Sequence, residues 1–499
     1  MTATLERDDS LRRTGSAVVT LAASELLGKV ATFLTFLVLA RVLGMQEFGV
    51  LSFGLSLGLL LGVVSSLGLD ARLVQLCSAR PELIDRCYGA LLAIRAVLSV
   101  AVLVPTTIVL YATMSVPHAT AVCLLVASAL LETFIDASRA VCGARQQQQL
   151  AALVLVAQRF AALGLSAGAL VLTRSAWCAA LGYLVATVVV GVVGMHVAAR
   201  RVGARPRFRG IRPEVRLILV AAPVMGLDEI ASMGLFRIDA ALIGVLLSTT
   251  AVGVYGASYR IFETVLFVSW TLSRAYVPVI AARAHDTEHV RTWARRSLTI
   301  ICAIYLPYGV VLALRGDDLV GLLFGAEYVH AGLFLALAPA PLLFGINHLC
   351  GSVLLARRPY PVVLVASVVG LVLNVGLNLW LIPVWGITAA AAASSLAFLV
   401  EAVIVLVPLT RLVGSIASVP ALVAIALATT CAGLFAAEVS SLGPALVGGV
   451  VVYLAAWALL SRALDPGGFA AFWALLRSPA GVGEEALEPQ ARGSSQIGA

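Results

Sequence analysis

Charged residues are scarce in this chain. They make up 12% of its 499 residues, whereas 61% of the residues are hydrophobic. This balance excludes a soluble domain, which would expose apolar surface to water on every side. Apolar stretches follow one another with hardly a break, and about 20 such residues are enough to cross a membrane as a helix. The sequence therefore predicts an all-α integral membrane protein.

We expect about fourteen transmembrane helices, because each apolar stretch is long enough to span the hydrocarbon core. The predicted spans are 15–40, 47–69, 88–112, 119–142, 150–173, 176–197, 217–246, 251–277, 297–314, 331–356, 361–383, 386–409, 416–436 and 441–461.

Lysine is almost absent, since Lys29 is the only one, and arginine therefore carries nearly all of the positive charge. Among the arginines of the predicted loops, all but Arg41, Arg174 and Arg315 fall on alternate loops. Basic loops stay in the cytoplasm. We therefore predict an even number of spans in the plasma membrane, with both termini cytoplasmic. The net charge of +8 reflects this bias and contact with anionic lipid head groups, and it does not indicate nucleic acid.

The most basic loop divides the chain. The predicted parts are a cytoplasmic N-terminus 1–14, a first six-helix bundle 15–198, a basic cytoplasmic linker 199–216, a second six-helix bundle 217–410, a helix pair 411–462 and a cytoplasmic tail 463–499.

The two bundles are interpreted as repeats. With an offset of 204 residues, Glu25 falls on Glu229 and Gly49 falls on Gly253. Both copies place the acid and the turn at the same depth in the same topology, so the axis relating them would run along the membrane normal. Two unrelated helices that each hold a glutamate are the alternative.

Catalytic and cofactor patterns are scarce. The sequence has no HExxH and no phosphate-binding GxxxxGK[ST], and its eight cysteines form no CxxC pair and no metal-ligand spacing. The arginine-poor loops are too short to hold a soluble catalytic domain. We predict no enzyme, no cofactor and no metal site.

Ionisable residues within the apolar stretches are the strongest functional signal, because a charge in hydrocarbon costs several kcal/mol unless it faces a cavity or a partner. They favour a hydrated cavity between the bundles, with cations for an anionic substrate and carboxylates for ion coupling. Local pairing at i+3 or i+4 is the alternative for Glu25–Lys29, Asp136–Arg139 and Arg260–Glu263. The residues concerned are Glu25, Lys29, Arg95, Glu132, Asp136, Arg139, Arg159, Asp228, Glu229, Arg237, Asp239, Arg260, Glu263 and Arg274.

Uncharged polar residues occupy the last spans of the second bundle. Asn374 and Asn378 lie one turn apart, with Ser394 on the next helix, and we assign them to helix packing. His348 is either a proton carrier or a core histidine whose hydrogen bonds are satisfied.

Several short segments resemble one family. They are Leu39-Ala-Arg-Val-Leu-Gly-Met-Gln-Glu-Phe-Gly49, Arg237-Ile-Asp239, Val252-Gly-Val-Tyr-Gly-Ala257, Leu323-Phe-Gly-Ala-Glu-Tyr328, and Leu373-Asn-Val-Gly-Leu-Asn378 with Ile382-Pro-Val-Trp-Gly386. Their order and spacing, over roughly residues 15–410, resemble polysaccharide flippases of the Wzx type, within the multidrug/oligosaccharidyl-lipid/polysaccharide exporter superfamily.

The resemblance implies two bundles of six helices plus two further helices. It also implies that a polyprenyl-pyrophosphate-linked sugar moves outward through a cavity by alternating access. Lys29 and Arg260 match basic positions that line the cavity in such relatives, and Arg95 and Arg274 are further candidates. The implied partners are a lipid-linked glycan, membrane lipids and a polysaccharide polymerase or glycosyltransferase.

Three other functions remain open. A small-molecule or multidrug antiporter of the same fold would couple to H⁺ or Na⁺ through Glu25, Glu229 and Asp239, which are also the coupling candidates for a flippase. A non-transporting membrane scaffold would tolerate apolar replacement of its charged stripes. An integral-membrane glycosyltransferase is disfavoured by short loops without acidic pairs.

The arginine bias predicts that the 199–216 linker is cytoplasmic. In a cysteine-free background, Arg205→Cys should react with a membrane-impermeant thiol reagent only after the cells are opened. Labelling of residue 205 in intact cells would contradict this topology.

Overall fold

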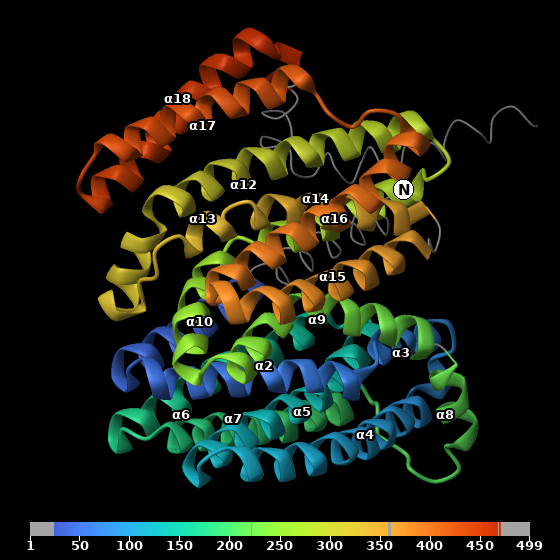
Figure 1. Ribbon diagram of the computed structural model, residues 1–499. Coiled ribbons are helices and arrows are strands. Elements are labelled where there is room, and N and C mark those ends of the chain that lie inside the picture. Colours follow the sequence, from blue (N-terminus) through green and yellow to red (C-terminus); the bar gives the residue numbers. More distant parts are fainter. Residues whose placement is uncertain (1–23, 221, 358–360, 468, 471–499) are drawn as a thin grey trace, which may run out of the picture.

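The computed structural model describes residues 24–220, 222–357, 361–467 and 469–470, and this part of the chain is helical and contains no strands (Figure 1). The predicted N-terminal segment 1–14 lies outside the described residues, and so does the part of the predicted tail beyond residue 470.

The helices follow one another through short turns. In chain order they are a first helix, Ser24–Leu43, then α2 (Met45–Ser66), α3 (Leu69–Ala79), η1 (Pro81–Leu83), α4 (Ile84–Thr113), α5 (Val116–Ala144), α6 (Gln148–Thr173), α7 (Ala176–Arg201), α8 (Arg212–Leu219), α9 (Ala222–Leu246), α10 (Thr249–Glu263), α11 (Phe267–Ala282), α12 (Thr287–Leu323), η2 (Ala326–Tyr328), α13 (Leu333–Leu337), α14 (Ala340–Arg357), α15 (Pro361–Trp385), α16 (Ile387–Val413), α17 (Val419–Glu438) and α18 (Leu442–Leu464).

The predicted membrane architecture is confirmed. Within the described residues, 12 helices are long and apolar enough to cross a membrane, and the count reaches 13 when the pair α8 and α9, bent by 54°, is taken as one span. The remaining predicted span, 251–277, corresponds to α10 and α11, which a turn at residues 264–266 separates. The seventh and eighth predicted spans are therefore broken helices.

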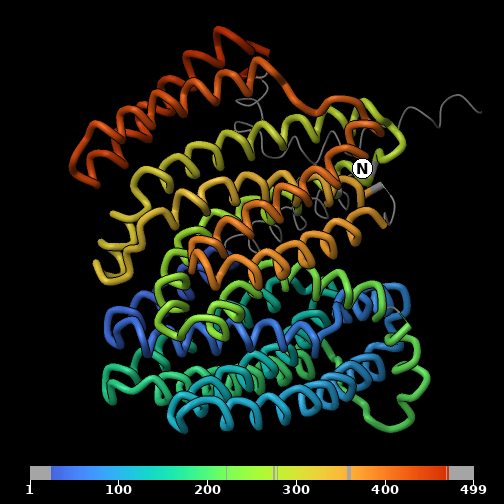
Figure 2. The backbone as a smooth tube through the Cα atoms, viewed as in Figure 1, coloured from blue at the N-terminus to red at the C-terminus, as the bar shows by residue number. Residues whose placement is uncertain are grey.

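The helices form two bundles, with a helix pair at the edge (Figure 1; Figure 2). Helices α2 to α7 form one bundle, and α11 to α16 belong to the other. Helices α9 and α10 also belong to this second bundle and form its face towards the first: both pack against α2, and α9 also packs against α15. Helices α17 and α18 pack against each other and against α12, at the outer edge of the second bundle.

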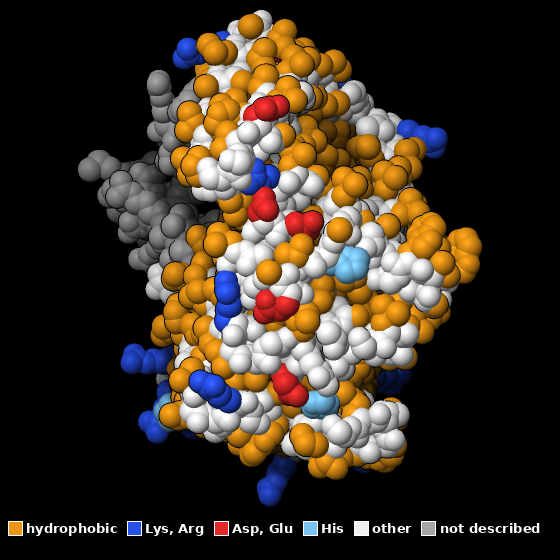
Figure 3. All heavy atoms as spheres, turned by 60° about the vertical axis from the view of Figure 1, so that its left-hand side comes forward, with side chains coloured by type: hydrophobic (Ala, Val, Ile, Leu, Met, Phe, Trp, Pro, Cys, Tyr) orange, Lys and Arg blue, Asp and Glu red, His pale blue; other side chains and the backbone are white. Residues whose placement is uncertain are grey.

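The outer faces of the helices are apolar. Ile108 is 66% exposed, Trp380 71% and Val447 69%. Figure 3 shows apolar side chains along both flanks of the visible face, with acidic side chains in a row between them. Such a surface suits lipid, because the helices satisfy their own backbone hydrogen bonds and expose hydrocarbon.

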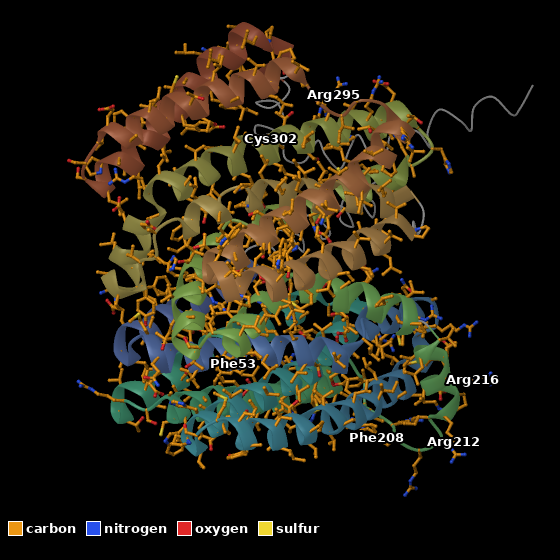
Figure 4. The ribbon with its side chains drawn as sticks, in the orientation of Figure 1. Phe53, Phe208, Arg212, Arg216, Arg295 and Cys302 are labelled. Atoms are coloured by element: carbon orange, nitrogen blue, oxygen red, sulfur yellow. The ribbon has the colours of Figure 1, made fainter. Side chains whose placement is uncertain are left out.

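The two ends of the bundle differ in charge. Arg212, Arg216 and Arg295 lie at the same end of the molecule (Figure 4). This end is called the arginine-rich side below, and the opposite end, where α2 and α10 begin, is called the arginine-poor side.

Two glycines bring α2 and α10 into backbone contact at the arginine-poor side. A Cβ placed on Gly49 would lie 1.8 Å from the carbonyl oxygen of Thr249, and one on Gly253 would lie 2.4 Å from that of Met45. These glycines are the pair that the offset of 204 residues aligns. The two glycines that the repeat hypothesis aligns therefore lie in contact, near the starts of α2 and α10.

Because no side chain fits at this crossing, Gly49→Ala should force α2 away from α10. Overpacking of this kind costs roughly 1–3 kcal/mol. We expect a lower midpoint of thermal unfolding for the purified protein in detergent. Gly164→Ala is the matched control, since a Cβ there has no atom within 4 Å and alanine is favoured over glycine inside a helix by about 0.5–1 kcal/mol. Equal midpoints for the two variants would contradict the close contact.

Candidate functional site

A cavity of about 440 Å³ lies between the two bundles. Its size falls in the range of small-molecule sites. The first helix, α2, α5, α6 and α7 line one side, and α9, α10 and α11 line the other. The lining residues are Glu25, Gly28, Lys29, Thr32, Phe33, Phe36, Leu55, Leu59, Ala129, Glu132, Leu155, Arg159, Tyr183, Glu229, Ser232, Met233, Phe236, Arg237, Arg260, Glu263, Thr264 and Trp270.

Three cationic side chains share one carboxylate on the second-bundle side of this cavity. Glu263 accepts a hydrogen bond of 2.5 Å from Arg237 and one of 2.6 Å from Arg260. Lys29 interacts electrostatically with the same three groups. Together they carry an excess of two positive charges, and we call them the cationic cluster. The side chains of both arginines and of Glu263 are 10–11% exposed, so little water screens them.

Aromatic rings contact Lys29 and Arg260 of the cationic cluster. The Lys29 ammonium lies 4.9 Å from the ring centre of Trp270, and the Arg260 guanidinium lies 3.6 Å from that of Phe36. The ring faces attract cations, and more strongly where water is excluded. The Nε atoms of Arg237 and Arg260 are buried and have no hydrogen-bond partner in the described part of the chain. The cluster therefore retains both charge and donors.

The break between α10 and α11 places Glu263 and Thr264 at the cavity wall. The carbonyls of Ile261 and Val265 keep backbone hydrogen bonds of 3.1 Å at the break, from the amides of Thr264 and Val268, and each accepts a second bond from a tyrosine. Here Tyr308 of α12 donates to the carbonyl of Ile261 at 2.5 Å, and Tyr305 donates to that of Val265 at 3.1 Å. Two tyrosines of one helix thus stabilise the break in another.

A second polar group lies on the first-bundle side of the same cavity. Glu132 of α5 accepts a hydrogen bond of 2.8 Å from the Tyr183 hydroxyl of α7. Arg159 of α6 donates to that hydroxyl at 3.3 Å and lies 3.5 Å from the Glu132 carboxylate. This group, called the Glu132 triad, joins three helices and carries no net charge.

Two candidate acids line the cavity towards the arginine-rich side. The Glu25 carboxylate lies 4.0 Å from Arg139. Glu229 accepts a hydrogen bond of 3.3 Å from Ser66, and its carboxylate also lies close to the Gly68 backbone, where α2 turns into α3. Glu229 thus connects α9 of one bundle with the end of α2 in the other.

Asp239 lies outside the cavity lining, in a buried network within the second bundle. Its carboxylate accepts hydrogen bonds from Asn378 at 2.7 Å, from Tyr255 at 2.9 Å and from Ser394. Asn374 also joins this network, through a bond of 2.9 Å from Asn378. No cationic side chain pairs with Asp239 in the described residues. The asparagines assigned to packing thus surround a candidate coupling acid.

The two other cations that the sequence suggested, Arg95 and Arg274, are not among the lining residues of the cavity. Arg95 is fully buried, donates to Asp70 at 2.6 Å and to the carbonyl of Thr133, and does not line the cavity. Arg274 falls on α11, but its side chain lies outside the described residues. His348 makes a hydrogen bond of 3.1 Å with Ser273.

Sequence reasoning identified Lys29 and Arg260, and the structure places both in one cavity. It counted Arg237 among the ionisable residues of the proposed cavity but did not select it for substrate binding, although Glu229, Met233 and Arg237 recur at i, i+4 and i+8 and must share a helix face. Two of the predicted local pairs are present: Asp136–Arg139 at 2.8 Å and Arg260–Glu263 at 2.6 Å. Tyr183 carried no charge pattern that could have identified it.

Contacts between the bundles close the arginine-poor side. Arg41, at the end of the first helix, donates to the carbonyl of Leu323 at 2.7 Å and to that of Leu322. The Tyr328 hydroxyl donates to the carbonyl of Ala40 at 3.1 Å. Aromatic rings pack near these contacts, with ring centres 5.6–6.3 Å apart. Phe33 and Phe48 contact Phe324, Phe48 also contacts Tyr328, and Phe36 contacts Phe48.

Comparison with known proteins agrees with this architecture. Residues 38–332 match the family described as polysaccharide biosynthesis protein. A probable low-salt glycan biosynthesis flippase of Haloferax volcanii, Agl15, is 26% identical over 169 residues, which cover 33% of this chain and 36% of that relative. The chain therefore aligns with about a third of that flippase's length.

Two solved structures share the fold. A lipid II flippase, MurJ, in an inward closed conformation matches with a TM-score of 0.74 at 11% identity, covering 89% of this chain and 99% of its own. An inward-facing multidrug resistance MATE transporter of the MOP superfamily matches with a TM-score of 0.64 at 15% identity, covering 80% and 98%. The fold is that of flippase-type transporters in this superfamily, and these similar proteins are transporters or flippases rather than enzymes.

Proposed function

Since this chain belongs to the polysaccharide biosynthesis protein family, we propose that it translocates polyprenyl-pyrophosphate-linked oligosaccharide units across the plasma membrane. The observation that carries the proposal is the cationic cluster of Lys29, Arg237 and Arg260 around Glu263. An excess of two positive charges between apolar helices needs an anionic partner. A diphosphate supplies that charge with several acceptor oxygens, which match the donors of two guanidinium groups.

The proposed cycle alternates access between the two sides. The cavity lining runs from Phe36 and Arg237 towards Glu25 and Glu229 at the arginine-rich side, which we propose to be cytoplasmic. Contacts of Gly49 and Arg41 close the opposite side. The substrate would enter from the cytoplasm, with its prenyl tail in lipid, and would leave after the two bundles rock and these contacts separate.

A cation-coupled antiporter for small molecules is the alternative. Many of the features above serve either function, but the cationic cluster distinguishes them. A cationic drug would be repelled by the excess charge of Lys29, Arg237 and Arg260, whereas an anionic lipid would be attracted. Among the described residues, the whole lining holds four cations and four carboxylates. It is therefore the local excess of positive charge in the cationic cluster, and not the net charge of the cavity, that favours the lipid-linked substrate.

We also propose that transport is coupled to H⁺ or Na⁺ through an acid of the bundle, with Glu25, Glu229 and Asp239 as the candidates. Glu229 is the first choice. Its partners Ser66 and Gly68 belong to the other bundle, so rocking changes its surroundings. An ion is coupled to a conformational cycle only if it binds the two states differently.

The cationic cluster predicts the behaviour of Arg260 variants. Loss of a hydrogen bond to a charged group costs about 1.5–3 kcal/mol, so Arg260→Ala should lower transport of a labelled prenyl-linked sugar into liposomes by tenfold or more. Arg260→Lys should retain part of the activity, because an ammonium keeps the charge but not the forked geometry. Arg209→Ala, in the exposed linker, is the control. Wild-type transport by Arg260→Ala would mean that this arginine serves only to pair with Glu263.

Coupling through Glu229 predicts a loss of response to a pH gradient. Glu229→Gln keeps the size and the hydrogen bond from Ser66 but cannot titrate, so flipping in liposomes should no longer depend on an imposed gradient. Glu25→Gln should have a smaller effect, since the carboxylate of Glu25 lies 4.0 Å from Arg139 of α5, on the same side of the cavity, and does not bridge the two bundles as Glu229 does. If both variants respond as the wild type does, these acids are structural and Asp239 becomes the coupling candidate.

A further inference from the structure

The Glu132 triad has no role in the proposed function so far. Its three residues come from α5, α6 and α7, all in the first bundle, and all three line the cavity that also contains the cationic cluster. The side chains of Glu132 and Arg159 are 13% and 27% exposed. They are therefore partly open to the cavity rather than sealed within helix contacts.

We propose that Glu132, Arg159 and Tyr183 form a subsite for the hydroxyl groups of the sugar nearest the diphosphate. This inference rests on the proposed function, because it divides one substrate between two parts of the cavity. The cationic cluster of the second bundle would bind the diphosphate. The Glu132 triad of the first bundle would bind the neutral glycan.

The net charges of the Glu132 triad and of the cationic cluster suit them to different parts of the substrate. In the triad, one guanidinium faces one carboxylate at 3.5 Å, so an anion gains little by approaching it. The cationic cluster holds one carboxylate for three cations and attracts anions strongly. A phosphate would therefore choose the cluster, and a neutral group would not be drawn there.

The unused hydrogen-bonding atoms of the triad match the hydroxyl groups of a sugar. Oε1 of Glu132 accepts the hydrogen bond from Tyr183, and no bond to Oε2 occurs among the described residues. Arg159 uses only one of its terminal nitrogens in the bonds present there. The group thus offers an acceptor and donors side by side. Sugar hydroxyls both donate and accept, so a carboxylate beside a guanidinium can bind two neighbouring hydroxyls.

The first helix places the two parts next to each other. A Cβ on Gly28 would lie 3.5 Å from the Arg159 side chain, whereas the following residue, Lys29, directs its ammonium to Trp270 of the other bundle. Lys29 and Arg159 also interact electrostatically. Consecutive residues of the first helix therefore face the triad and belong to the cationic cluster, and a sugar bonded directly to a diphosphate could contact both.

Binding of two lipids tests this division. The probes are the lipid-linked glycan purified from cells that carry the gene, and the corresponding polyprenyl diphosphate without its glycan. Glu132→Gln should weaken binding of the glycan-bearing lipid to purified protein by about tenfold, which corresponds to about 1.4 kcal/mol. Its affinity for the bare diphosphate should stay unchanged or rise, because the variant removes a negative charge from the cavity. Tyr183→Phe should act in the same direction with a smaller effect.

Controls separate this inference from the proposed function and from simple misfolding. Tyr111→Phe removes a hydroxyl that bonds Thr120 outside the cavity and should leave both affinities unchanged. Arg260→Ala should weaken both lipids. An equal loss of both lipids in Glu132→Gln, or no loss of the glycan-bearing lipid, would overturn the sugar subsite and leave the diphosphate site intact. A wild-type protein that binds neither lipid would overturn both proposals.

Discussion

The pairing of two buried guanidinium groups with one carboxylate, close to a third cation, is the interaction on which the centre of this molecule depends. An isolated charge between apolar helices is costly, and removing one partner of a buried pair leaves the other uncompensated. Glu263 accepts hydrogen bonds from Arg237 and Arg260 and interacts electrostatically with Lys29. Helices from both bundles must therefore converge on a single residue, which sits at the broken end of α10.

The bundles are held together differently at their two ends. At the arginine-poor side, Gly49 and Gly253 allow backbone contact, and Arg41 binds the carbonyls at the end of α12. These contacts are short-ranged and involve no buried ion pair. They can therefore separate without exposing an uncompensated charge. At the arginine-rich side, the corresponding link is the hydrogen bond between Glu229 and Ser66. Such an arrangement suits two bundles that rock as units.

The fold could be predicted from the sequence because its determinants are local. Apolar length gave the spans, and ion pairs one turn apart, such as Asp136–Arg139, followed from helical spacing. The break between α10 and α11 could not be predicted. The stretch 251–277 reads as one span, and the tyrosines that donate to the carbonyls at the break lie about forty residues later, on α12.

The same limit applies to the candidate site. The depth of Lys29 and Arg260 in their helices placed both near the middle of the membrane, and a resemblance to known transporters selected them. Whether a buried cation faces a cavity or a partner depends on neighbouring helices, which spacing within one helix does not reveal. Arg95 illustrates this, since it pairs with Asp70 of α3 rather than lining the cavity. Arg237 is the opposite case, since it was not selected for substrate binding from the sequence and yet lines the cavity.

The surroundings of the candidate coupling acids favour one of them on mechanical grounds. Every hydrogen-bond partner of Asp239 described above belongs to the second bundle, on α10, α15 or α16. Rocking of the bundles as rigid units would leave that shell unchanged, and an ion held there would bind both access states equally. Glu229 has its partner on α2, in the first bundle, so the same motion breaks its shell. Since coupling requires unequal binding in the two states, Asp239 can serve only if α9 also bends within its own bundle, whereas Glu229 needs no motion beyond the rocking itself.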